Sequence, residues 1–169
     1  MIKIKVTKKS NSKRGSSAVY VPLSSRTGIK VIKSSNFANK CRYKTERELV
    51  KSAVFRIAKV EEKLLRRASK SGLSPKGYGV RPVKLGNFFY AGIKMQHIPG
   101  KRSRETEKNI EILDAAIEQV FKTTGLKHTD DHIKNFILWK NKGYLIDFDP
   151  LYIKGKYRNK LMRWFRQRK

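Results

Sequence analysis

Apolar and polar residues alternate along several short stretches of the chain, and this period of two is typical of β-strands with one buried face. The clearest pair runs through Tyr78–Leu85 and Phe88–Met95, where Gly86 and Asn87 supply a tight turn. These residues predict a β-hairpin. The same alternation predicts strands at 2–6, 18–23, 29–33, 136–139 and 144–148.

A helical period replaces the alternation from Thr45 to about Ser71, where apolar residues recur every three or four positions. Thr45 and Glu48 have the spacing of a capping box, and Gly72 follows where a C-terminal cap is expected. The pattern therefore predicts one long helix. Its apolar stripe consists of Leu49, Ala53, Ile57, Val60, Leu64 and Leu65.

Two further helices are predicted in the C-terminal half. The first runs from about Glu105 to Thr123, and the second is a basic amphipathic helix over residues 154–169. Because strands precede the helices for most of the chain, the fold class predicted is α+β, with a sheet-rich N-terminal part and a helical C-terminal part. The apolar face of the first helix consists of Ile110, Leu113, Ile117, Val120 and Phe121, and that of the second contains Tyr157, Leu161, Trp164 and Phe165.

The charge of the chain indicates the sign of its partners. Its 169 residues contain 41 Lys and Arg against 13 Asp and Glu, which gives a formal net charge of +28. Such a protein is attracted to nucleic acid or to an acidic protein, and its affinity falls with salt. A solvated lysine-rich surface without any partner would have the same composition.

Cysteine content and hydropathy exclude several classes of protein. The single Cys41 excludes a disulfide framework and a multi-cysteine metal site, and it suits a reducing compartment. No apolar run approaches the roughly 18 residues of a membrane span, and the first residues do not resemble a signal peptide. We therefore expect a cytoplasmic protein without a membrane span, or one in the host cytoplasm if a virus or phage encodes it.

The acidic residues are unevenly distributed. Four of the five Asp residues lie within twenty positions, at Asp130, Asp131, Asp147 and Asp149, whereas residues 1–45 contain no acid at all. Such a cluster could balance local positive charge. It could equally bind a hard cation, because Mg²⁺ prefers carboxylate and phosphate oxygens.

The residues around these carboxylates form a recognisable motif. His128, Asp130 and Asn135 have the spacing H-x-D-x-x-x-x-N, and Asp147-Phe148-Asp149 follows twelve residues after Asn135. This order resembles the catalytic loop and the metal-binding D-F-G of protein-kinase-like phosphotransferases. His132 adds the variant H-x-D-x-H-x-x-N, which is common in aminoglycoside phosphotransferases and other atypical kinases.

The resemblance extends upstream. Lys30 takes the place of the lysine that contacts the phosphates, and Glu61 that of its partner glutamate, although the adjacent Glu62 is an open alternative. The segment around Glu61 is similar to the helix of RIO-type kinases and of the kinase in the KEOPS tRNA-modification complex. The resemblance implies a hinge for adenine at Gln96, His97 and Ile98, and two domains, an N-lobe over 1–98 and a minimal C-lobe over 99–169.

Several positions depart from the kinase pattern. Only Gly15 remains of the glycine-rich loop, so Ser16 and its neighbours would have to cover the phosphates. Asp149 replaces the glycine of D-F-G, which removes conformational freedom there. Only twenty residues follow Asp149, and they contain no A-P-E motif, so the C-lobe is expected to be strongly truncated.

The resemblance implies a minimal Ser/Thr kinase that uses ATP and Mg²⁺ and is autophosphorylating or activated by a partner. Lys30 would contact the phosphates, Asn135 and Asp147 would bind Mg²⁺, and Asp130 would orient the acceptor hydroxyl. Two alternatives remain open. One is a nucleotide-binding pseudokinase that acts as a basic module for an acidic protein or nucleic acid, and the other is a nucleic-acid-binding protein with a chance motif.

Overall fold

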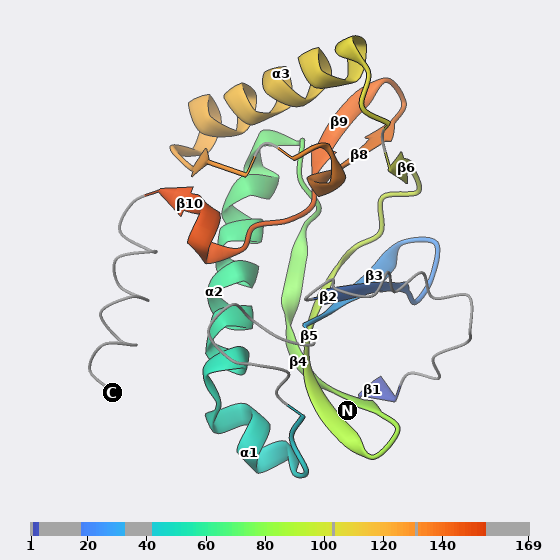
Figure 1. Ribbon diagram of the computed structural model, residues 1–169, viewed down its shortest axis with the longest axis vertical. Helices are drawn as coiled ribbons and strands as arrows, with labels where there is room; N and C mark the ends of the chain where they lie inside the picture. The colour runs from blue at the N-terminus through green and yellow to red at the C-terminus, as the bar shows by residue number, and fades with distance from the viewer. Residues whose placement is uncertain (1, 4–17, 33–41, 103, 131, 155–169) are drawn as a thin grey trace. The chain divides into compact units, whose positions relative to one another are not determined.

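The computed structural model describes residues 2–3, 18–32, 42–102, 104–130 and 132–154 (Figure 1). The chain divides into two compact units, each described here by itself. The first consists of Met1–Glu62 and Gly77–His97, and the second of Lys63–Lys76 and Ile98–Lys169. Helices and strands are both present in the described part of the chain, so the predicted α+β class is confirmed.

The first unit contains a five-stranded sheet with the order β1-β4-β5-β3-β2. β1 pairs with β4 in parallel, and the other neighbours are antiparallel. The predicted hairpin is confirmed, because Leu85 pairs with Phe88 and Gly86 takes a left-handed φ of +59°. The strands are β1 (Ile2–Lys3), β2 (Ala18–Pro22), β3 (Thr27–Ile32), β4 (Gly77–Leu85) and β5 (Phe88–Gln96).

Side chains of β3 lie alternately on the two faces of this sheet. Ile29 and Val31 of β3 are fully buried and pack with Val83 of β4. Because side chains alternate along a strand, Lys30 lies on the opposite face. Tyr20 of β2 pairs with Lys30 in the antiparallel ladder and therefore shares that face.

The prediction of one long helix after Thr45 is wrong in one respect, because the helix is broken at Ser52. α1 (Glu46–Lys51) ends there, and α2 (Ala53–Ala68) begins at the next residue. Ser52 is extended, with φ −75° and ψ 160°. Its hydroxyl donates to the Leu49 carbonyl at 2.6 Å and accepts from the Phe55 N–H at 3.2 Å. One serine therefore caps both helices. A serine hydroxyl can do so because it forms hydrogen bonds with nearby main-chain groups in place of the helical ones.

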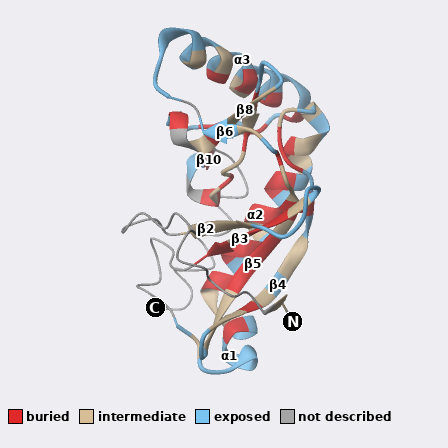
Figure 2. Ribbon diagram, turned by 90° about the vertical axis from the view of Figure 1, so that its right-hand side faces the viewer, coloured by how far each residue is buried: buried red, intermediate tan, exposed pale blue. Residues whose placement is uncertain are grey.

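Both predicted caps of this helical segment are confirmed. Thr45 and Glu48 form a reciprocal capping box at the start of α1. After α2, the short helix η1 (Ser69–Ser71) ends at Gly72, whose φ of +75° lies in the left-handed region that favours glycine. The buried face of α2 contains Val54, Phe55, Ile57, Ala58, Leu64, Leu65 and Ala68, together with Glu61 and Glu62 (Figure 2).

The second unit contains a three-stranded sheet, order β6-β8-β9, and a two-stranded sheet of β7 and β10. Phe136 of β8 pairs with Leu145 of β9, and both are fully buried. The strand expected at 144–148 lies instead at 142–145, because left-handed φ angles at Lys140 and Asn141 close a tight turn. Residues 146–148 are not in a strand, so that part of the prediction is wrong. The elements are β6 (Lys101–Arg102), β7 (Lys127–His128), η2 (Ile133–Asn135), β8 (Phe136–Trp139), β9 (Lys142–Leu145), η3 (Pro150–Tyr152) and β10 (Ile153–Lys154).

The helix α3 (Glu107–Thr124) packs on β9 and lies close to where it was predicted. The prediction of its apolar face is only partly correct, because Ile110 and Phe121 are 42% and 47% exposed. The buried residues recur at intervals of three or four, which centres the buried stripe to one side of Ile110 and Phe121. That stripe consists of Leu113, Ala116, Val120 and Thr124.

Parts of three predicted elements lie outside the described residues, namely strand residues 4–6 and 33 and residues 155–169 of the basic helix. No helix in the part of the chain that the structure describes is long and apolar enough to cross a membrane.

Candidate functional site

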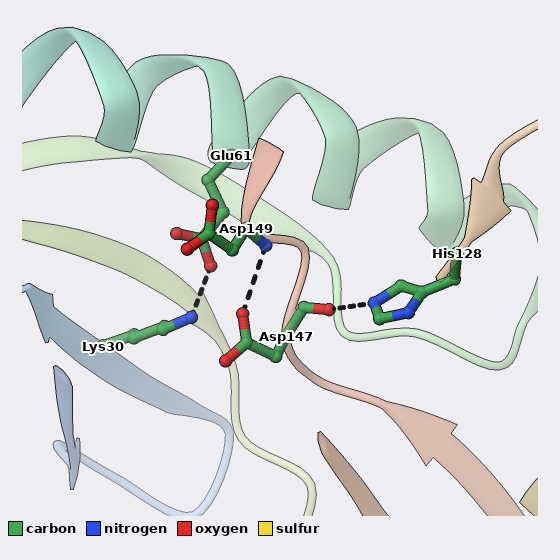
Figure 3. A network of polar contacts seen from close by, with 5 residues as sticks. All are labelled: Lys30, Glu61, His128, Asp147 and Asp149. Atoms are coloured by element: carbon green, nitrogen blue, oxygen red, sulfur yellow. Dashed lines mark hydrogen bonds and ion pairs between the residues drawn. The ribbon is translucent and has the colours of Figure 1, made fainter. Parts of the chain in front are cut away.

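Lys30 is held by an ion pair inside the first unit. Its Nζ donates a hydrogen bond to Oε1 of Glu61 on α2 at 2.5 Å (Figure 3). The two side chains are only 13% and 6% exposed. Because the pair is largely removed from water, its electrostatic attraction is stronger than that of a surface pair. The central strand and the helix together therefore fix a positive charge on the face of the sheet opposite to Ile29 and Val31.

The neighbouring Glu62 has a different partner. It is buried, and its Oε1 accepts a hydrogen bond from the main-chain N–H of Gly79 on β4 at 2.9 Å. Of the two adjacent glutamates that the sequence left open, Glu61 is the one paired with Lys30. Glu62 joins α2 to β4.

Tyr20 lies on the same face of the sheet as Lys30, and the sequence analysis did not single it out. Its ring covers Gly28 so closely that a Cβ at that position would stand 2.0 Å from the hydroxyl, so a side chain there would displace the ring. The hydroxyl is hydrogen-bonded to Nδ1 of His97 at 2.8 Å, and the two rings stack with centroids 5.9 Å apart. Burial raises the pKa of Tyr20 to about 12.

The residues expected to contact adenine come at the end of β5. Gln96 is the last residue of that strand, and His97 follows it. The main-chain N–H of His97 donates to the Arg26 carbonyl at 3.0 Å. A nucleobase that accepted a hydrogen bond from this N–H would therefore have to displace the Arg26 carbonyl. Ile98 is buried and belongs to the second unit.

In the second unit, His128 connects the two halves of the carboxylate motif. Its Nε2 lies 2.6 Å from the main-chain oxygen of Asp147 (Figure 3). Its Nδ1 accepts a hydrogen bond from the main-chain N–H of Asp130 at 3.3 Å. Since a carbonyl only accepts, the proton lies on Nε2 and Nδ1 carries the lone pair. The ring is buried and meets Phe148 edge-on, with centroids 5.4 Å apart.

The loop that carries Asp130 is fastened at its start. β7 pairs with β10, so His128 lies opposite Ile153. The N–H and hydroxyl of Thr129 both donate to the Tyr152 carbonyl, at 2.8 and 2.7 Å. The chain segment after Asp149 therefore returns to hold the loop before Asp130.

Asn135 and Asp147 are brought together by the β8–β9 hairpin. The N–H of Ile146 donates to the Asn135 carbonyl at 2.9 Å, which sets Asn135 beside the residue that precedes Asp147. Oδ1 of Asp147 accepts from the main-chain N–H of Asp149 at 3.2 Å. Asp130, Asn135, Asp147 and Asp149 are all partly exposed.

These residues fit a magnesium ion in their donor chemistry. Nδ2 of Asn135 is buried and has no hydrogen-bond partner among the described residues. A half-turn of the amide exchanges Nδ2 with Oδ1. A ligand could therefore satisfy this amide in two ways, as an acceptor for Nδ2 or as a cation bound to Oδ1. A carboxylate and an amide oxygen with phosphate oxygens form a suitable Mg²⁺ ligand set. In the described part of the chain, no three His, Cys, Asp or Glu residues form a metal-binding group by themselves.

Some predicted site residues cannot be placed. Gly15 and Ser16 of the expected phosphate loop, and Asp131 beside Asp130, lie outside the described residues. The structure pairs Lys30 with Glu61 in one unit and links Asp130, Asn135 and Asp147 in the other. Tyr20 could have been found in the sequence only from the register of β2 on β3, which brings it opposite Lys30.

Comparison of the chain with protein-family models and with curated proteins found no match to either.

Proposed function

We propose that this protein is a minimal, protein-kinase-like phosphotransferase that moves the γ-phosphoryl group of ATP to a hydroxyl acceptor with the help of Mg²⁺. The observation that carries the proposal is the contact of His128 with both Asp130 and Asp147, which orders the loop and the Asp-Phe-Asp segment as one unit. The Lys30–Glu61 pair supports the same function independently, because protein kinases place a strand lysine against a helix glutamate.

The strand order gives further support for a kinase-like fold. β2, β3, β5 and β4 are successive neighbours, and α2 is inserted in the chain between β3 and β4. Lys30 therefore lies on an inner strand and Glu61 on the helix that follows it, as the proposed assignment requires.

The proposed mechanism is phosphoryl transfer by positioning and charge neutralisation. Lys30, oriented by Glu61, binds oxygens of the α- and β-phosphates. Asp147 and Asn135 would hold Mg²⁺, which would supply positive charge to neutralise the phosphates. Asp130 orients the acceptor hydroxyl and takes its proton as the new O–P bond forms and the bond to the β-phosphate oxygen breaks, so ADP leaves.

The first test of this proposal is ATP binding. We expect ATP to raise the unfolding temperature of the full chain, and Mg²⁺ to increase that rise, because a ligand that binds only the folded state stabilises it. Asp147→Asn should remove the increment from Mg²⁺ and keep the rise from ATP alone. If the variant keeps the whole Mg²⁺ increment, Asp147 is not a metal ligand.

A second measurement separates transfer from binding. With γ-labelled ATP and a generic acceptor such as myelin basic protein, or the chain itself, Asp130→Ala should reduce label transfer at least a hundredfold while the affinity for ATP changes only a few-fold. Lys44→Ala, at an exposed lysine, is the matched control. Binding without transfer in the wild type would indicate a nucleotide-binding pseudokinase, and no binding would overturn the proposal.

A further inference from the structure

The second unit contains a hollow whose residues have no role in the proposed function. It has a volume of about 320 Å³ and lies between the first turns of α3 and the β8–β9 turn. Figure 1 shows these two elements side by side. The hollow is lined on one side by Lys108, Asn109 and Ile112, and on the other by residues 138–141. Two of these residues are lysines, and no acidic residue lines the hollow among those described.

An aromatic residue and a lysine stand together at this hollow. Trp139 is partly exposed, and Nζ of Lys140 lies 4.8 Å from the centroid of its ring. On the other strand, Tyr144 contacts the same indole, with ring centroids 5.8 Å apart. A cation over an indole face is a favourable contact, and a ligand that binds this face of the ring would take the place of the ammonium.

The backbone at Lys140 is unusual for a lysine. Lys140 and Asn141 have left-handed φ angles of 51° and 59°, which suit asparagine or glycine in a two-residue hairpin turn. A lysine in this region is disfavoured by roughly 1 kcal/mol. The turn therefore keeps a cation at a position where asparagine would be more stable, and it directs that cation toward Trp139.

More positive charge continues along the neighbouring strand. β6 pairs with β8, so Lys101 lies opposite Leu138, one of the residues that line the hollow. Arg102 and Lys142 are exposed on the same small sheet. Glu107 and Glu111 of α3 lie near in sequence but do not line the hollow. The local charge is therefore suited to an anion that extends beyond the hollow.

We propose that this hollow binds single-stranded nucleic acid. A base stacks on Trp139, and the adjoining phosphates contact Lys140 and Lys108. As the base arrives, the Lys140 ammonium exchanges its contact with the indole for a phosphate oxygen. The volume suits one nucleotide, and proteins that bind single strands combine such aromatic surfaces with basic tracks. An acidic peptide would satisfy the lysines but would leave the indole unused.

Intrinsic fluorescence tests the stacking directly. The chain has two tryptophans, so in a Trp164→Phe background the emission comes from Trp139 alone. We expect a thymidine decanucleotide to quench this emission saturably. A DNA duplex with the same number of phosphates, a heparin oligosaccharide and a poly-glutamate peptide should leave it nearly unchanged. Equal quenching by any of these, or no quenching by the decanucleotide, would overturn the proposal.

Substitutions at the turn separate binding from folding. Lys140→Asn should raise stability, because asparagine suits the left-handed turn, and should weaken decanucleotide binding severalfold. It should also reduce the slope of log K against log salt by about 0.7, as expected for one lost phosphate contact. Lys63→Asn, at an exposed lysine on α2, is the control for loss of one charge. Unchanged binding in Lys140→Asn, or an equal loss in the control, would contradict the proposal whether or not the kinase assignment holds.

Discussion

At the scale of single residues, the Lys30–Glu61 pair illustrates how stability and function depend on the same contact. Both side chains are nearly buried, so the pair gains attraction and loses hydration at once. Its net contribution to stability is therefore small compared with the loss expected when one partner is left alone. The pair is better explained as a way to hold an ammonium in place than as a source of stability.

This explanation predicts a non-additive pair of substitutions. Glu61→Gln should lower the free energy of unfolding by about 3 kcal/mol, because it removes the carboxylate that pairs with a largely buried ammonium. Lys30→Met combined with Glu61→Gln should recover most of that loss of stability. The proposed binding of ATP should remain weaker in the double variant than in the wild type. Urea unfolding of the single and double variants measures the coupling. Additive losses would show that the two residues do not act as a pair.

Tyr20 leads to a prediction about alkaline pH. Its pKa is raised from 10 to about 12 by burial, so the folded state keeps the phenol protonated where the unfolded state loses the proton. Stability from this residue is therefore complete below pH 10 and is lost as the pH rises toward 12. We expect the stability advantage of the wild type over Tyr20→Phe to be present at pH 8 and to shrink by pH 11.

Chemical denaturation of both proteins at the two pH values provides the measurement. Tyr78→Phe, at an exposed tyrosine, is the control for general effects of alkaline solution. A difference between wild type and Tyr20→Phe that stays constant with pH would show that burial of the phenol does not govern its titration.

The same residues show what a sequence can predict about a site. The sequence resembles kinase motifs at five positions, and this resemblance selected Lys30, Glu61, Asp130, Asn135 and Asp147. The choice between Glu61 and Glu62 required the helix phase relative to the sheet, which depends on tertiary packing. The role of Tyr20 required the register of β2 on β3, which the length of the turn after Leu23 sets and the alternation does not.

At the scale of secondary structure, Ser52 determines where α1 ends and α2 begins. We expect Ser52→Ala to lower the free energy of unfolding by about 1–2 kcal/mol, because one hydroxyl supplies two capping hydrogen bonds. Ser52→Thr keeps the hydroxyl and should lose less. Ser69→Ala, which removes a single bond to the Arg66 carbonyl, is the matched control in a thermal or urea unfolding series. A more stable Ser52→Ala protein would mean that the segment prefers one continuous helix.

Elements were predictable where one residue decides a local geometry. The capping box at Thr45 and the left-handed glycines at 72 and 86 ended or turned the chain as expected. The break at Ser52 was not predictable, because serine is tolerated inside helices and the sequence does not show that its hydroxyl caps α1 and α2 at once. Ile110 and Phe121 are exposed because of the orientation in which α3 packs on β9. The apolar period of the sequence predicts a helix but does not determine which side of it faces the sheet.

At the scale of the whole molecule, the excess of positive charge acts on stability as well as on partners. A net charge of +28 on 169 residues makes the compact state repel itself, and the unfolded chain relieves that repulsion. The buried Lys30–Glu61 pair is little affected by ions in solution, because salt screens exposed charges far more than buried ones. The stability of the protein should therefore be limited by its surface charge at low ionic strength.

The expected result is that the unfolding midpoint rises as sodium chloride increases from 10 to 150 mM. Over this range the screening length falls from about 30 to about 8 Å. Potassium fluoride at the same ionic strength should give the same rise if screening is the cause, whereas binding of one particular anion would make the two salts differ. Lys63→Glu combined with Lys70→Glu, at exposed lysines, should raise the midpoint in 10 mM salt and flatten its dependence on salt. A midpoint that falls with salt would show that exposed ion pairs outweigh the repulsion.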